Sequence, residues 1–158
     1  MDEIWNVIQC VLSSEIFLTV ISGVLVFVLG QLFNEYFLKP IQAYKQLRAK
    51  IAYNLTLYAH FYMNPIKITQ KNEDYSNASY DLRKLAAEVD SMIELKPLGN
   101  FFIARKKTLC EVSKNLIGIS NGFYTDNCST AMENNGTYRN NIYTLLRINC
   151  HSEKKRKK

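Results

Sequence analysis

The chain has 158 residues and a formal net charge of +6, enough for one domain and a membrane anchor but too short for two independent hydrophobic cores. The last five residues, 154–158, carry +5 of this charge, which leaves the rest of the chain near neutral, at +1. Four scattered cysteines form no CxxC pair and have no histidine at ligand spacing, which argues against a zinc site.

A transmembrane helix is predicted at 15–37, after a short extracytoplasmic N-terminus at 1–14. Its central part, Ile16 to Phe33, contains eighteen residues without a charge. At about 1.5 Å per residue this part spans roughly 27 Å, close to the hydrocarbon thickness of a bilayer. A cleaved signal peptide fits less well, because the chain starts with two acidic residues and no small-residue cleavage site follows the apolar run.

The distribution of basic residues predicts how this helix is oriented. No lysine or arginine precedes the helix, whereas Lys39, Lys45, Arg48 and Lys50 follow it closely. The positive-inside rule therefore places the N-terminus outside and the rest of the chain in the cytoplasm.

Polar and small residues of the predicted span gather on one side when residues are placed at about 100° intervals. They are Glu15, Thr19, Ser22, Gly23, Val26, Gly30 and Asn34. Such a stripe suits close contact between helices, or a water path in an oligomer with Glu15 at its outer mouth. Both interpretations require several copies of the chain. The remaining interpretation is a monomeric anchor in which Ser and Thr bond to their own backbone.

Residues 38–150 are predicted to form a cytoplasmic helical bundle. Pro40 is expected to kink the chain or to start a new helix. Apolar residues at three- and four-residue steps predict an amphipathic helix over 41–62, ended by Pro65. No stretch alternates strongly enough to form a strand, so the predicted fold class is all-α, with one N-terminal transmembrane helix.

Three further helices are predicted in this bundle. They cover about 77–95, 108–121 and 138–149. A polar loop at 67–76, a turn at 97–99 and an irregular segment at 126–136 connect the predicted helices. Thr108 and Glu111 have the spacing of a capping box, which predicts that the helix at 108–121 begins at Thr108.

The search for chemistry favours binding over catalysis. The sequence contains no phosphate-cradling glycine loop, nucleophile elbow or zinc motif, so we predict no enzyme activity, no metal and no cofactor. Basic residues with ten tyrosines suit a single-stranded nucleic acid, although basic residues near a bilayer equally suit lipid headgroups. The candidate ligand-binding residues are Arg83, Lys84, Arg105, Lys106, Lys107 and Lys114.

The C-terminal segment 151–158 is predicted to be a disordered, solvated tail. The alternative is that its basic run presses on anionic lipid or on nucleic acid, at about 1 kcal/mol per charge near a membrane surface.

Several segments taken together resemble a known protein family, although no single motif does. They are Leu29–Phe33, Leu38–Ile41, Ile51-Ala52, Leu55, Tyr58-Ala59, Tyr62, Asn64-Pro65, Leu82–Ala86 and Asn115–Asn121. On these segments the chain resembles a family of small single-pass bacterial membrane proteins that act in anti-phage defence, the Hailong-type membrane effectors. None of the segments is a chemical motif, so they bear on family more than on mechanism.

The resemblance implies a partner and a signal. In that family a nucleotidyltransferase encoded nearby makes a single-stranded oligodeoxyadenylate, which binds the oligomeric effector and holds its ion path in check. Two features depart from the pattern: Lys39 stands where an acidic residue is expected before the proline, and the basic tail is an addition.

The resulting hypothesis is a homo-oligomer, such as a tetramer, that forms a gated ion path in the bilayer under control of the oligonucleotide. The alternative hypothesis is a non-conducting, membrane-tethered scaffold that recruits a cytosolic partner.

Overall fold

The computed structural model describes residues 14–70, 72–94 and 103–148. They fall into two compact units, Met1–Pro40 and Ile41–Lys158. The described residues form helices and their connections, with no strand among them, so the predicted all-α fold class is confirmed. Three predictions lie outside the described residues: the structure of 1–13, the turn at 97–99 and the tail at 151–158.

The first unit contains one long apolar helix, α2 (Glu15–Phe33). Ser14 caps it, because its hydroxyl accepts a hydrogen bond from the Phe17 N–H at 3.1 Å. None of its residues is buried. Within the described residues, the helical stretch that starts at Glu15 is the one long and apolar enough to span a membrane.

A π-helical turn, η1 (Asn34–Leu38), follows α2, and its last hydrogen bond runs from the Lys39 N–H to the Asn34 carbonyl. The α-helical part of the predicted span at 15–37 therefore ends at Phe33. Pro40 explains the wider turn. Its ring nitrogen has no hydrogen to donate to the Tyr36 carbonyl four residues earlier, and its ring crowds that carbonyl. Helix α3 follows directly at Lys39, within a helical stretch that runs from Glu15 to Leu57, so the chain does not leave the helical conformation at Pro40.

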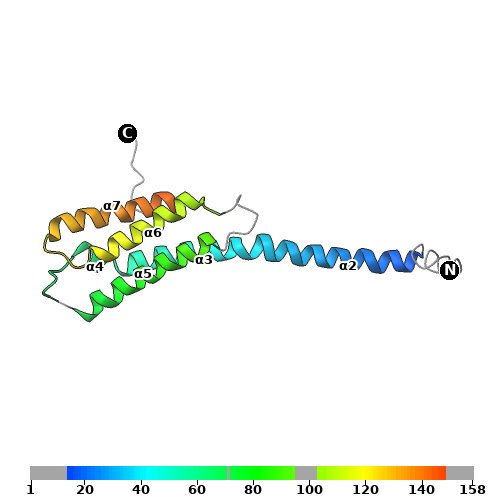
Figure 1. Ribbon diagram of the computed structural model, residues 1–158, viewed down its shortest axis with the longest axis horizontal. Coiled ribbons are helices and arrows are strands. Elements are labelled where there is room, and N and C mark those ends of the chain that lie inside the picture. Colours follow the sequence, from blue (N-terminus) through cyan, green and yellow to red (C-terminus); the bar gives the residue numbers. More distant parts are fainter. Residues whose placement is uncertain (1–13, 71, 95–102, 149–158) are drawn as a thin grey trace, which may run out of the picture. The chain divides into compact units, whose positions relative to one another are not determined.

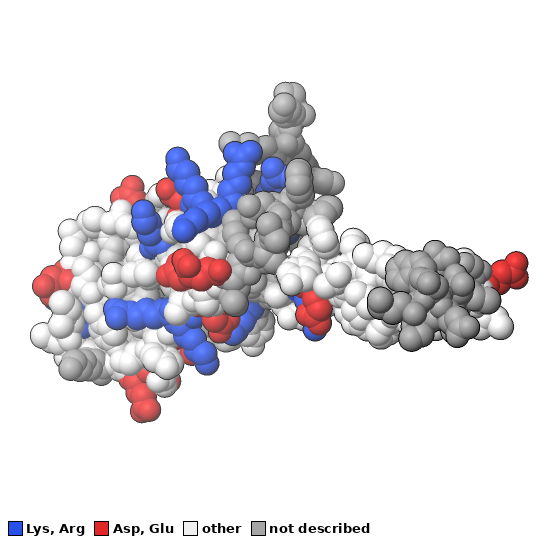
Figure 2. Space-filling model, turned by 45° about the vertical axis from the view of Figure 1, so that its right-hand side comes forward, with Lys and Arg blue, Asp and Glu red and all other residues white. Residues whose placement is uncertain are grey.

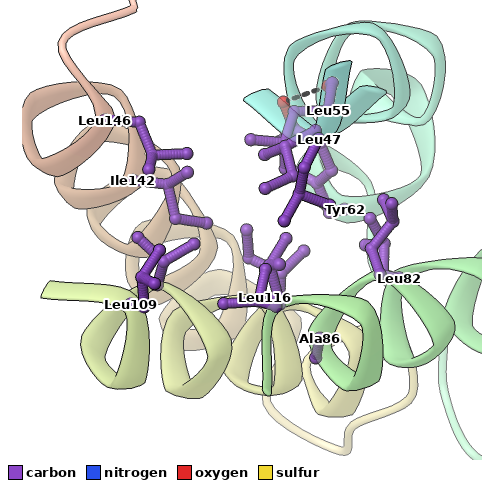
Figure 3. Close-up of a cluster of buried hydrophobic side chains, with 14 of the residues drawn as sticks. Leu47, Leu55, Tyr62, Leu82, Ala86, Leu109, Leu116, Ile142 and Leu146 are labelled. Carbon is purple, nitrogen blue, oxygen red and sulfur yellow. Dashed lines mark hydrogen bonds between the residues drawn. The ribbon is translucent and has the colours of Figure 1, made fainter. Parts of the chain in front are cut away.

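The second unit is a bundle built from α3 (Lys39–Leu57), whose first two residues belong to the first unit, and from α4 (Ala59–Met63), α5 (Glu73–Glu94), α6 (Lys106–Asn121) and α7 (Cys128–Leu146). Helix α6 lies between α5 and α7 (Figure 1). Every one of these helices contributes buried side chains to one core. Figure 3 shows Leu47 and Leu55 of α3 facing Leu116 of α6, with Ile142 of α7 beside them.

The predicted first helix of the bundle is interrupted where it was expected to continue. It ends at Leu57, and Tyr58 leaves the helical conformation with φ −91° and ψ 12° before the short α4 begins. The Tyr62 hydroxyl then donates to the Leu55 carbonyl at 2.8 Å, the dashed line in Figure 3. A carbonyl at the helix end thus finds a side-chain donor inside the core.

Two predicted loops were partly wrong, because helices α5 and α7 begin earlier than expected. Helix α5 begins at Glu73, inside the loop predicted at 67–76, and Glu73 and Asp74 suit the positive end of its dipole. Helix α7 begins at Cys128, inside the segment predicted to be irregular, and Asn127 caps it by accepting from the Thr130 N–H at 3.2 Å.

The predicted helix ends also need correction. Helix α6 begins at Lys106 with Arg105 at the N-cap position, so the predicted capping box is wrong and Thr108 lies inside the first turn. Helix α7 stops at Leu146, short of 149, because Arg147 adopts a left-handed conformation with φ 52°. Its N–H and the N–H of Ile148 bond back to the last turn, which closes the helix.

A tyrosine–carboxylate pair links the junction between α3 and α4 to α5. The Tyr58 hydroxyl donates to an oxygen of Asp81, and this hydrogen bond is the main reason that the pKa of Tyr58 is raised to about 12. The folded chain therefore resists ionisation of Tyr58, whereas the unfolded chain ionises near the ordinary pKa of about 10.

This pair predicts a stability change at high pH. Its contribution to the free energy of unfolding is present below about pH 10 and is lost as the pH rises through about 12. We expect the stability difference between the wild type and Tyr58→Phe to shrink over that interval. Denaturant unfolding of both proteins at several pH values measures it, and Asp81→Asn should remove the same pH dependence. A constant difference across the interval would contradict the assignment.

Candidate functional site

The predicted seam lies on α2 and at the start of η1. Glu15, Thr19, Ser22, Gly23, Val26 and Gly30 are exposed on α2, and Asn34 is half-buried as the first residue of η1. Because α2 is a regular α-helix from Glu15 to Phe33, the 100° spacing used to assign the stripe holds over that length.

The hydroxyl groups of this stripe bond within the helix itself. The Thr19 hydroxyl donates to the Glu15 carbonyl at 2.8 Å, and the Ser22 hydroxyl donates to the Thr19 carbonyl at 2.8 Å. Their donors therefore need no partner from another helix, as the monomeric interpretation also requires. Their oxygens can still accept a bond.

The two glycines of the stripe leave open space beside the helix. A Cβ atom added at Gly23 or at Gly30 would meet nothing within 4 Å. The backbone is therefore exposed at two points that are seven residues apart, about two helical turns. Close approach of a second helix at small residues uses such exposed backbone.

Three of the predicted ligand-binding residues meet at the N-terminal end of α6. Arg105 is its N-cap residue, Lys106 and Lys107 are its first two residues, and all three are exposed. The Arg105 side chain makes no capping hydrogen bond at this end. Cations are unfavourable at a helix N-terminus by a few tenths of a kcal/mol or more, and its N–H groups favour an anion.

The other predicted ligand-binding residues lie elsewhere. Lys114 is exposed two turns along α6, with the Glu111 carboxylate between it and Lys107 on the same face. Arg83 lies near the opposite end of α6, because its Nε donates to the Ser120 hydroxyl and its Nη2 to Asn121, both at 2.9 Å. At 1.5 Å per residue that end is about 20 Å from Lys107.

Arg83 is therefore part of the contact between α5 and α6. Ser79 adds to it, since its hydroxyl lies 2.8 Å from the Ser120 hydroxyl and 3.2 Å from the Ser120 carbonyl. Lys84, next to Arg83, is exposed. The six predicted residues thus do not form one cluster. In Figure 2, Asp and Glu side chains lie between those of Lys and Arg, so basic and acidic residues alternate on this face.

Sequence reasoning missed a polar contact of α7 with α4 and with the C-cap residue of α6. Asn135 is fully buried, and its Nδ2 donates to the Tyr62 carbonyl at 2.9 Å and to the Gly122 carbonyl at 3.4 Å. A cavity of about 280 Å³ opens beside it and is lined by amide, hydroxyl and tyrosine side chains, with no charged residue. None of the predicted ligand-binding residues lines this cavity. The sequence signal for this contact was the group of asparagines near 127–135, but such a group is also typical of a loop.

Among the described residues, no group of three or more His, Cys, Asp and Glu side chains lies close enough to hold a metal ion. Cys110 and Cys128 are free and half-buried thiols. Comparison with family models, with curated proteins and with solved structures gives no match to the chain.

Proposed function

We propose that the protein is a homo-oligomeric membrane effector of bacterial anti-phage defence. In this proposal copies of α2 associate in the inner membrane, with the C-terminal unit in the cytoplasm, and form an ion path. A single-stranded oligodeoxyadenylate made by a partner nucleotidyltransferase controls that path. The proposal rests mainly on helix α2, which is apolar and has no buried residue. Its backbone is exposed at Gly23 and Gly30.

The physical reason is that a helix exposed on all sides is stable in lipid and unstable in water. Burying its apolar surface in hydrocarbon gains about 25 cal/mol for each Å². A tether requires only this burial of one apolar helix in lipid. The open glycines and the polar stripe go beyond what a tether requires, and the family resemblance supports an oligomeric path over a tether.

The ligand part of the proposal centres on the N-terminal end of α6. Arg105, Lys106 and Lys107 repel the positive end of the helix dipole, and a phosphate group would relieve that repulsion. Arg83 is a weaker candidate than the sequence suggested, because two of its donors already bond to Ser120 and Asn121.

The test is ion flux through liposomes that contain the full chain. We expect potassium flux, and we expect it to change when single-stranded oligodeoxyadenylate is added on the side of the C-terminal unit. The variant Lys106→Gln/Lys107→Gln should conduct but lose the response. Lys45→Gln/Lys67→Gln removes the same charge from exposed positions elsewhere and should keep it.

Flux that is absent with and without the oligonucleotide would overturn the conducting proposal and favour the scaffold. Flux that ignores the oligonucleotide would retain the path but remove its proposed signal.

A further inference from the structure

The end of α2 and the residues that follow it, Phe33–Lys39, combine four features within seven residues. The rings of Phe33 and Phe37 stack with centroids 5.2 Å apart and 21° between their planes. Tyr36 is 50% exposed, and Glu35 forms an exposed ion pair with Lys39. The same residues contain the π-helical turn η1.

The π-helical turn has a preferred depth if α2 lies in a bilayer. Pro40 cannot donate to the Tyr36 carbonyl, and a peptide carbonyl without a donor costs several kcal/mol in hydrocarbon. In the headgroup region water can donate to any carbonyl that the proline leaves without a donor. The eighteen uncharged residues that end at Phe33 already match the hydrocarbon thickness, at about 27 Å, so η1 begins where the hydrocarbon ends.

The side chains around η1 suit the same depth. Tyrosine is enriched at the membrane–water interface because its ring is apolar and its hydroxyl is polar. An exposed ion pair such as Glu35–Lys39 costs little in hydrated surroundings and much in hydrocarbon. Phe33 is the last residue of α2 and Phe37 lies in η1, so their stacked rings lie across this boundary.

We propose that Phe33–Lys39 is a docking surface for the phospholipid headgroup region, with the π-helical turn at the bilayer boundary. This inference rests on the proposed membrane function and adds the depth of the chain in the lipid. Because Glu35 and Lys39 compensate each other, the surface carries no net charge. It therefore recognises the interface of zwitterionic lipid and does not require anionic lipid.

Fluorescence quenching by depth tests the proposal on the full chain in phosphatidylcholine vesicles. Trp5 is the single tryptophan of the sequence, so Trp5→Phe gives a background without one. Tyr36→Trp in that background reports on η1, and Val24→Trp is the matched reporter near the middle of α2. We expect headgroup nitroxides to quench the first reporter about two-fold or more better than deep bromolipids do, and the reverse for the second. Adding phosphatidylglycerol should leave both patterns unchanged.

The outcomes separate this proposal from the proposed function. If both reporters are quenched by the deep bromolipids, η1 lies in hydrocarbon and the docking surface is wrong while the membrane span stands. If only aqueous quenchers reach the reporter at position 36, the docking surface is also wrong. If neither reporter responds to quenchers in lipid, α2 does not enter the bilayer, and both proposals fail. A pattern that needs phosphatidylglycerol would overturn the zwitterionic assignment.

Discussion

Replacing Gly122 with alanine is expected to lower the free energy of unfolding by about 2–3 kcal/mol. The added Cβ would lie 2.3 Å from Oδ1 of Asn135 and 2.8 Å from its Nδ2. The Asn135 amide cannot move away cheaply, because it is fully buried and bonds to the Tyr62 carbonyl at 2.9 Å. The substitution therefore forces either a shift of α6 against α7 or the loss of a buried hydrogen bond.

Gly136→Ala is the matched control for this prediction. Gly136 lies inside α7, and a Cβ atom there would meet nothing within 4 Å. Alanine should raise stability at this position by about 0.5–1 kcal/mol, because it is the better helix former. Urea unfolding of the full chain in a mild detergent, followed by circular dichroism, compares the two. Equal effects from both substitutions would show that the Gly122–Asn135 contact is not a close one.

Replacing Gly23 and Gly30 together with leucine is expected to abolish self-association of the chain in lipid. Leucine would fill the open space beside the backbone on the proposed seam and hold a second helix away. A loss of about 1.4 kcal/mol already weakens association ten-fold. Crosslinking in liposomes over a range of protein-to-lipid ratios measures the change, and flux should fall with it.

Val24→Leu/Val28→Leu provides the matched control. Both valines are exposed on α2 and lie on the side opposite the stripe, so leucine there adds apolar volume without blocking the seam. The control should crosslink like the wild type. If the glycine variant also crosslinks like the wild type, the stripe is not the contact, and a tether becomes the better hypothesis.

Local pattern was sufficient for the helical character of the chain. The uncharged run from Ile16 to Phe33 and the three- and four-residue steps of apolar side chains depend on residues a few positions apart, and they predicted α2 and the inner faces of the bundle. They also predicted the helix that follows Pro40. Local pattern did not predict the π-helical turn. The sequence shows that Pro40 has no N–H, but it does not show which hydrogen bonds the preceding residues form instead.

Helix starts depended on distant partners. The asparagines in the first half of α7 have low helix propensity, so the sequence resembled a loop, yet Asn135 lies in that helix, where it bonds to the distant Tyr62 carbonyl. Similarly, Tyr75 is buried and donates to the Asn64 carbonyl at 2.8 Å, which holds the early start of α5.

The candidate ligand site shows the same division. Sequence alone identified the basic residues, since charge is a property of the residue. Only the packing of α5 against α6 decided that Arg83 bonds to Ser120, at the end of α6 opposite Lys107. Likewise, Asn135 is 73 residues from Tyr62 and 13 from Gly122 in the chain. Contacts of that separation depend on how whole helices pack, which the periodicity of one helix does not contain.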